Sequence, residues 1–388
     1  MLMINLRRII ILLAVFALFC IPAAAENDEL GANELIDEYS EIYSGYLLDG
    51  SGDIIDESLT PYSQGFSLDE LIGRAARGEI PLSAKGLLSE LFESLFGEVL
   101  SVLKSMMLVV ALAVLSSLLE GLSGGISKEG AYSIARYVCF IAVVGLAARV
   151  FYDVINSAGS AIENLALFMR CIVPIMITSL ITSGAVVSAS ALEPFLLGIT
   201  EAALSLIQYV FMPLVMIGTA LGIVNSISSE LKTTGLISLI NKTVKYGLSV
   251  LLTIFVAFAG LKSIASAGTD GLTLKLTKFA SSNLIPVVGG ILSDAVETVM
   301  NCSAVIKNAL GVVGVIIIFF IAVMPILRLT ASLLVFRLVA AVCEPIGNKG
   351  AAECITVMGD GISTAFSMLA AVTVMFIMII TIMINIAV

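Results

Sequence analysis

Two long apolar stretches without a charge restrict the folds open to this chain. Residues 309–327 and 362–388 contain no Asp, Glu, Lys or Arg. A helix needs about 20 apolar residues to cross the roughly 30 Å of hydrocarbon in a bilayer, so each stretch suffices for one crossing. In water such runs would leave no polar face for the solvent. The sequence therefore predicts a protein embedded in a membrane.

The overall composition supports the same interpretation. Hydrophobic residues make up 59% of the chain and charged residues 13%, whereas soluble domains are about half apolar and about a quarter charged. Seven stretches are predicted to span the bilayer: 101–119, 132–152, 171–191, 195–224, 244–265, 309–327 and 362–388. Two more, 276–302 and 329–346, are shorter or more polar, and are re-entrant, interfacial or true spans. We expect an all-α polytopic membrane domain over 101–388, with six to eight transmembrane helices.

Residues 1–25 have the three parts of a secretory signal peptide. Arg7 and Arg8 give the positive start, residues 9–19 the apolar core, and residues 23–25 a small-residue cleavage site. These small residues favour cleavage over an uncleaved anchor. With either outcome, the chain after residue 25 begins outside the cytoplasm.

Residues 26–100 form an acidic extracytoplasmic segment. It contains 17 acidic and three basic residues, and so carries a net charge of −14. Nucleic acid and anionic lipid would repel it, which argues against both as its partners. The part over 26–66 is predicted to be loosely ordered in isolation. Its Tyr39, Tyr43 and Tyr46 follow a helical spacing and either dock on a partner or pack a short local helix.

Two further helices are predicted between the acidic segment and the first span. Ser67 and Glu70 form a capping box that starts the first helix, and Gly78 ends it. The second, over 81–100, is amphipathic, because its apolar residues recur at three- and four-residue steps while its glutamates face away. We expect this helix on the outer membrane face or against partner helices. Acidic faces bind anionic lipid poorly, which favours contact with protein.

The distribution of basic residues leaves one part of the topology open. Lys128 and Arg136 fit a cytoplasmic connection after the first span, because basic residues favour that side. Lys232, Lys242 and Lys245 then fall where simple alternation of the predicted spans puts the outside. Either one predicted segment does not cross fully, or residues 226–243 form a surface helix.

An internal repeat is predicted from a recurring offset of 112 residues. The paired positions are Pro174 with Pro286, Pro213 with Pro325, Gly235 with Gly347, and Gly247 with Gly359. Residues 165–260 and 277–375 therefore resemble two copies of one unit with Pro-broken helices. Paired interrupted segments of this kind are typical of transporters and channels built from repeats. The copies would be inverted if each unit crosses the membrane an odd number of times.

The prolines and charges inside apolar stretches are the candidate functional residues. A proline removes a backbone hydrogen bond, which lipid does not replace, so Pro174, Pro213, Pro286 and Pro325 are expected to face the protein interior. There they either kink helices for packing or line a pathway.

Several charges also lie within or beside the predicted spans. The acidic ones include Glu201, Asp294 and Glu297, and Arg328 or Arg337 is a plausible counter-ion for Asp294 or Glu297. A charge near the bilayer centre costs several kcal/mol unless it is paired or faces water. A polar or ion-coupled path is one interpretation, and side chains that reach up to the interface are the other.

The residue types present argue against an enzyme. The chain has no histidine, and its six cysteines have no C-x-x-C spacing. The sequence therefore predicts no catalytic residue, no cofactor and no metal site.

The run from Thr277 to Gly290, with Ser293–Val299 and Ile306–Asn308, resembles the stage III sporulation protein AE family. The layout of a signal peptide, an acidic exported segment and a polytopic domain resembles that family too. The resemblance implies a protein of the mother-cell membrane around the forespore. It also implies membership in the channel or feeding complex that the stage III A proteins form with the stage II Q protein, and these proteins would be its partners. The alternative is an independent secondary transporter with inverted repeats, in which Asp294 and Glu297 would matter individually.

Overall fold

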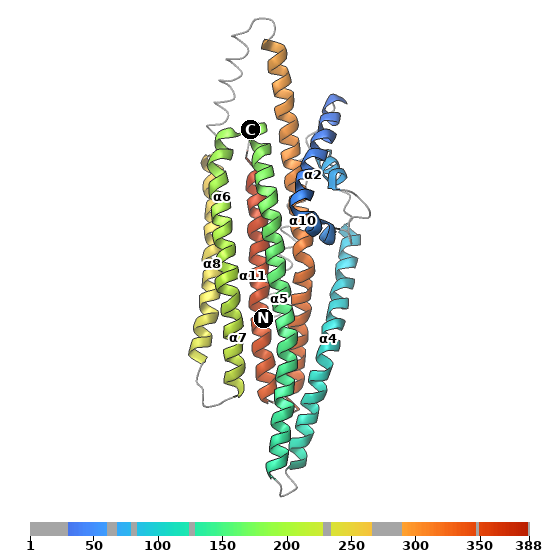
Figure 1. Ribbon diagram of the computed structural model, residues 1–388, viewed down its shortest axis with the longest axis vertical. Helices are drawn as coiled ribbons and strands as arrows, with labels where there is room; N and C mark the ends of the chain where they lie inside the picture. The colour runs from blue at the N-terminus through green and yellow to red at the C-terminus, as the bar shows by residue number, and fades with distance from the viewer. Residues whose placement is uncertain are drawn as a thin grey trace.

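A computed structural model describes residues 30–59, 68–78, 84–123, 129–227, 234–265, 289–346 and 349–386. Within these ranges every regular element is a helix (Figure 1). The helices are α2 (Leu30–Leu59), α3 (Leu68–Ala76), α4 (Ala84–Ser123), α5 (Glu129–Thr182), α6 (Val186–Leu206), the π-helical turn η1 (Ile207–Phe211), α7 (Met212–Ile227), α8 (Thr234–Ala265), α10 (Gly289–Cys343) and α11 (Lys349–Ile384).

Six helical segments in this part of the chain are long and apolar enough to cross a membrane. They are Leu91–Leu118, Tyr137–Thr182, Leu196–Ile227, Thr234–Ala257, Val299–Cys343 and Lys349–Ile384. In Figure 1, α4, α6–α7 and α10 run in one direction, and α5, α8 and α11 run in the other. The prediction of an all-α polytopic membrane protein is confirmed, with six candidate spans among the described residues.

Helix α5 joins two stretches that were predicted as separate spans, 132–152 and 171–191. The residues between them include no proline, and Ala158 and Ile162 are fully buried, so the helix continues. It ends instead at Thr182, where Gly184 takes a φ of 97° and the Ala185 amide donates to the Leu180 carbonyl at 3.0 Å. This is a glycine-based helix end. The prediction of one span over 171–191 is therefore wrong, because the chain reverses inside it.

This single crossing accounts for the basic residues that conflicted with alternation. With α5 counted once, α7 ends and α8 begins at the same end of the bundle as the α4–α5 connection (Figure 1). Lys242 and Lys245 lie in the first half of α8, near that end. The basic residues then favour one side, as expected for the cytoplasmic end.

Helix α10 likewise unites 309–327 with 329–346, and its first turns include the described part of 276–302. At about 1.5 Å per residue its 55 residues extend about 80 Å, well beyond one bilayer. Its N-terminal turns project past the other helices (Figure 1).

The described prolines do not break their helices, so that prediction is wrong. Pro174 and Pro325 lie inside the continuous helices α5 and α10. Pro213 follows the π-helical turn η1, which widens the backbone where the proline ring would otherwise crowd the carbonyl four residues earlier. Pro286 lies outside the described residues.

The direction of the helices excludes an inverted repeat. Gly247 and its counterpart Gly359 lie on α8 and α11, which run the same way, as do α6–α7 and α10 (Figure 1). Inverted copies would need opposite directions. Two copies in the same direction remain a prediction.

Helices α2 and α3, here called the cap, pack beside α10 and α5 near the end where α5 and α11 finish (Figure 1). Leu47 and Ile55 are 1% exposed, which explains why a segment predicted to be loosely ordered alone is helical on the bundle. The helix α3 begins at Leu68, and Gly78 follows it with a φ of 77°, as the capping signals predicted.

Close packing of α11 against its neighbours holds the bundle together. Phe366 and Phe376 are buried on α11, which contacts α5, α7, α8 and α10. Gly361 allows α11 to approach Thr219 of α7 and Phe151 of α5. Small residues at such crossings are how membrane helices reach close contact.

Candidate functional site: a polar groove at the end away from the cap

A polar groove of about 660 Å³ opens at the end of the bundle opposite the cap. It lies where α7 and α10 end and α11 begins. Its lining residues are Asn225, Ser226, Arg337, Ala340, Ala341, Glu344, Lys349, Ala352, Glu353, Thr356 and Val357.

The spacing of polar residues on α11 creates one wall of this groove. Lys349, Glu353, Thr356 and Asp360 recur at three- and four-residue steps, which places them on one face of the helix. Residues on other faces, such as Ile355, are buried in the core. The polar face therefore extends into the bundle from its end.

Arg337 and Asp360 form an ion pair on the inner side of the groove. The Arg337 Nη2 donates to Asp360 Oδ1, from α10 to α11. The Asp360 carboxylate lies about 16 Å along α11 from its first residue. The side chains are 32% and 48% exposed, and Arg337 lines the groove. Pairing lowers the cost of placing each charge at this depth.

The structure does not join Asp294 or Glu297 to Arg328 or Arg337, as the sequence had suggested. All four residues lie on α10, and the 34 residues from Asp294 to Arg328 correspond to about 50 Å of helix. Asp294 and Glu297 lie in the first turns of α10, and their side chains lie outside the described ones. Arg328 is exposed.

Glu201 has a different partner, on the outside of the bundle. Arg170 of α5 donates from Nε to Glu201 Oε1 at 2.6 Å and from Nη2 to Oε2 at 2.9 Å. The side chains of Arg170 and Glu201 are 51% and 45% exposed. Neither residue faces the polar groove.

The prediction that the prolines face the interior is wrong for two of them. Pro174 and Pro213 are exposed, and Pro325 is half-buried. On α5 the inward face is formed by apolar neighbours such as Ile172 and Met176, which leaves Pro174 pointing outward.

A second set of polar contacts lies beneath the cap. Tyr43 of α2 makes side-chain hydrogen bonds with Ser179 and Thr182 of α5, and its burial raises the pKa of the phenol above its usual 10.0. The Lys307 ammonium is only 3% exposed and donates to the Ile386 carbonyl at 2.9 Å. The first contact joins the cap to α5, and the second joins α10 to the residues that follow α11.

The groove presents charged and hydroxyl side chains, among them Arg337, Glu344 and Ser226. Its hydroxyl at Ser226 donates to the Gly222 carbonyl at 3.0 Å, and so is engaged with its own helix. Among the residues described, no group of three or more His, Cys, Asp or Glu could hold a metal ion.

Sequence reasoning singled out neither the groove nor Asp360. The polar spacing from 349 to 360 was the available signal, but it sits at the edge of a strongly apolar run. Glu344 and Glu353 also belong to the groove and were missed.

Comparison with known proteins places the chain among relatives. A family model described as stage III sporulation protein AE matches residues 66–387. Stage III sporulation protein AE of Bacillus subtilis (strain 168) is 30% identical over 365 residues, which cover 94% of this chain and 86% of that protein. No solved structure matches the chain.

Proposed function

Because this chain belongs to the stage III sporulation protein AE family, we propose that it is a membrane component of a channel complex between mother cell and forespore. The complex is the one formed by the stage III A proteins and the stage II Q protein, and it supports development of the forespore. The chain would act there as a platform in the mother-cell membrane around the forespore.

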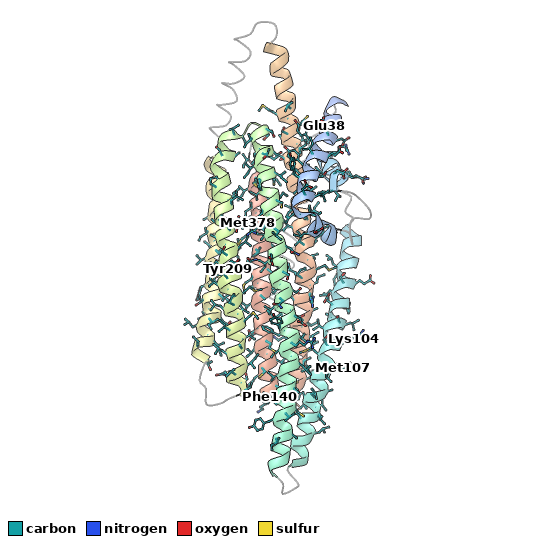
Figure 2. All side chains as sticks on the ribbon, in the orientation of Figure 1. Glu38, Lys104, Met107, Phe140, Tyr209 and Met378 are labelled. Atoms are coloured by element: carbon teal, nitrogen blue, oxygen red, sulfur yellow. The ribbon has the colours of Figure 1, made fainter. Side chains whose placement is uncertain are left out.

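The observation that carries this proposal is the cap. It is folded onto the six-span bundle, so a partner bound to the cap is held at a fixed place relative to the membrane. Glu38, Ile42, Tyr46 and Asp49 are exposed on α2 and recur at three- and four-residue steps (Glu38 is labelled in Figure 2). This face is free of contact with the bundle and suits a protein partner between the two membranes.

The polar groove supports a second candidate, an independent transporter. Its lining mixes polar and apolar residues, and Arg337 on that lining pairs with Asp360. The shared direction of α8 and α11, and of α6–α7 and α10, counts against the inverted repeats that the sequence suggested for such a transporter.

Two sets of variants in sporulating cells separate these functions. Ile42→Lys with Tyr46→Lys alters the outward face of the cap, and Asp360→Asn alters the groove. A platform predicts that the cap variant loses co-purification with stage III A proteins and forms few heat-resistant spores, while Asp360→Asn keeps its partners. A transporter predicts the reverse: full assembly by both variants, and loss of spores with Asp360→Asn alone.

A matched variant and an abundance measurement distinguish a lost contact from a lower amount of protein in the membrane. Leu48→Lys changes an exposed apolar residue beside the same face of α2, at 41% exposure. Membrane abundance of every variant is measured by immunoblot, and only variants present at the level of the unchanged protein are compared.

A further inference from the structure

Arg170 and Glu201 both lie within segments that are long and apolar enough to cross the membrane, Tyr137–Thr182 and Leu196–Ile227. Ile172, two residues beyond Arg170, fills the space left by Gly314 of α10 together with Ile380 of α11. Gly314 and Ile380 belong to the uncharged stretches 309–327 and 362–388. The ion pair is thus level with the most apolar part of the bundle.

At that depth the pair points away from its own bundle. About half of each side chain is uncovered. Pro174 is exposed on α5, and Pro213 is exposed on α7, which follows α6 through η1. Tyr209, between Glu201 and Pro213, is 77% exposed (Figure 2). Charges within membranes almost always face protein or water, and lipid offers no partner to the Arg170 carbonyl, which cannot bond to Pro174. A second protein surface is needed here.

The opposed charges themselves identify the occupant. Arg170 and Glu201 lie side by side at one depth, on adjacent helices. A two-fold axis along the membrane normal relates two copies without changing the depth of any atom. The ion pair of the second copy is therefore rotated by half a turn relative to that of the first. Arg170 then meets the partner's Glu201, and Glu201 meets the partner's Arg170, so four charges close into a neutral ring. A face with charge of one sign would repel its own copy.

The surface beside the ion pair permits such an approach. Ala202 and Ser205 of α6 are exposed and small, and Gly198 has no neighbour within 4 Å of the position a Cβ would take. Small residues allow the backbones of two membrane helices to come close. We propose that two copies of this chain pair in the membrane through the outer face of α5 and α6, centred on Arg170 and Glu201.

Cysteine cross-linking in native membranes tests the contact. In a chain without its own cysteines, Ala202→Cys is expected to form a disulfide-linked dimer on mild oxidation. Val250→Cys on α8, where the side chain is 57% exposed, is the matched control and is expected to remain monomeric. Equal cross-linking at both positions, none at position 202, or a product there of a mass other than two chains would overturn the proposal.

Charge exchange tests the ring. Arg170→Glu or Glu201→Arg alone is expected to weaken dimerisation at least about tenfold, and the combined exchange is expected to restore it. The dimer fraction is measured by counting bleaching steps of a labelled chain in lipid vesicles. Single variants that dimerise like the unchanged chain would contradict the ring.

Ser205→Phe provides a test that does not touch the charges. It blocks close approach from an exposed position, so the dimer should be lost while the melting temperature of the bundle is kept. An unchanged dimer would contradict the proposal. The bleaching and melting measurements use the purified chain alone, so a monomeric result there counts against the dimer and leaves the proposed function standing. If the dimer is intact but the chain does not co-purify with stage III A proteins, only the proposed function is contradicted.

Discussion

Arg337 of α10 donates a hydrogen bond to the carboxylate of Asp360 on α11, and this ion pair joins the two helices at the groove. The sequence alone does not connect Arg337 with Asp360. Arg337 lies in α10, which was predicted as two separate segments, and Asp360 lies in the next helix. A single substitution at either residue therefore tests this contact between α10 and α11.

Asp360→Asn removes the negative charge of that pair and keeps its size. Because the two side chains are 32% and 48% exposed, we expect a loss of stability of only about 0.5–1 kcal/mol. Thermal unfolding in detergent measures the change. Asp360→Leu with Arg337→Met replaces the pair by apolar side chains and should recover most of that loss; a double variant less stable than Asp360→Asn would contradict this account.

Two glycine substitutions separate helix propensity from packing. Gly145→Ala is in open space on α5 and should stabilise the protein by up to about 1 kcal/mol. Gly361→Ala gains the same propensity, but its methyl group would lie 2.5 Å from Thr219 Oγ1 and 2.9 Å from Phe151 Cε2. Overpacking typically costs about 1–3 kcal/mol, so this variant should be less stable than the unchanged protein. Equal melting temperatures for the two variants would show that α11 does not pack closely there.

Docking of the cap should weaken at alkaline pH through Tyr43. The pKa of Tyr43 is raised by burial, so the docked state favours the neutral phenol. Its contribution is complete below pH 10 and is lost as the pH rises past 10, because the undocked phenol ionises first. Hydrogen exchange of α2 amides should therefore accelerate above that pH. Tyr43→Phe should remove this part of the dependence, while Tyr46→Phe, at an exposed position, should leave it unchanged.

Single cysteines in a cysteine-free chain test the arrangement of the spans. Gly235→Cys and Lys349→Cys are expected to react with a membrane-impermeant thiol reagent from the cytoplasmic side. Gly184→Cys and Asn385→Cys are expected to react from the outside, with the cap. Labelling of positions 235 and 184 from the same side would mean that α6 and α7 do not cross together.

The class of fold was accessible from the sequence, because uncharged stretches such as 362–388 have few alternatives. The division into helices was not. The chain reverses at Gly184, inside a stretch apolar enough to be predicted as one span, because backbone bonds and the Ser183 hydroxyl satisfy the carbonyls of the turn. Conversely, the less hydrophobic stretch around Ala158 stays helical since it is buried against neighbouring helices. Hydropathy indicates whether a segment lies in the membrane, and it does not indicate where the chain turns.

The partners of the candidate site residues also depended on the packing of the helices, which the sequence does not give. Glu201 was recognised as unusual from its apolar surroundings, yet its partner Arg170 and its outward direction depend on how α5 meets α6. Pro174 was expected inside the bundle because the carbonyl that a proline leaves unbonded needs a protein neighbour. In an assembly, a second chain can supply that neighbour. Asp360 was missed because its significance comes from Arg337, which is 23 residues away.

Helix α10 is in contact with the cap near one end and carries Arg337 near the other, without a break between them. A hydrogen-bonded helix resists stretching and compression along its axis, so it behaves as a strut. A displacement of the cap along this axis would therefore reach the groove through a single helix, without an intervening loop.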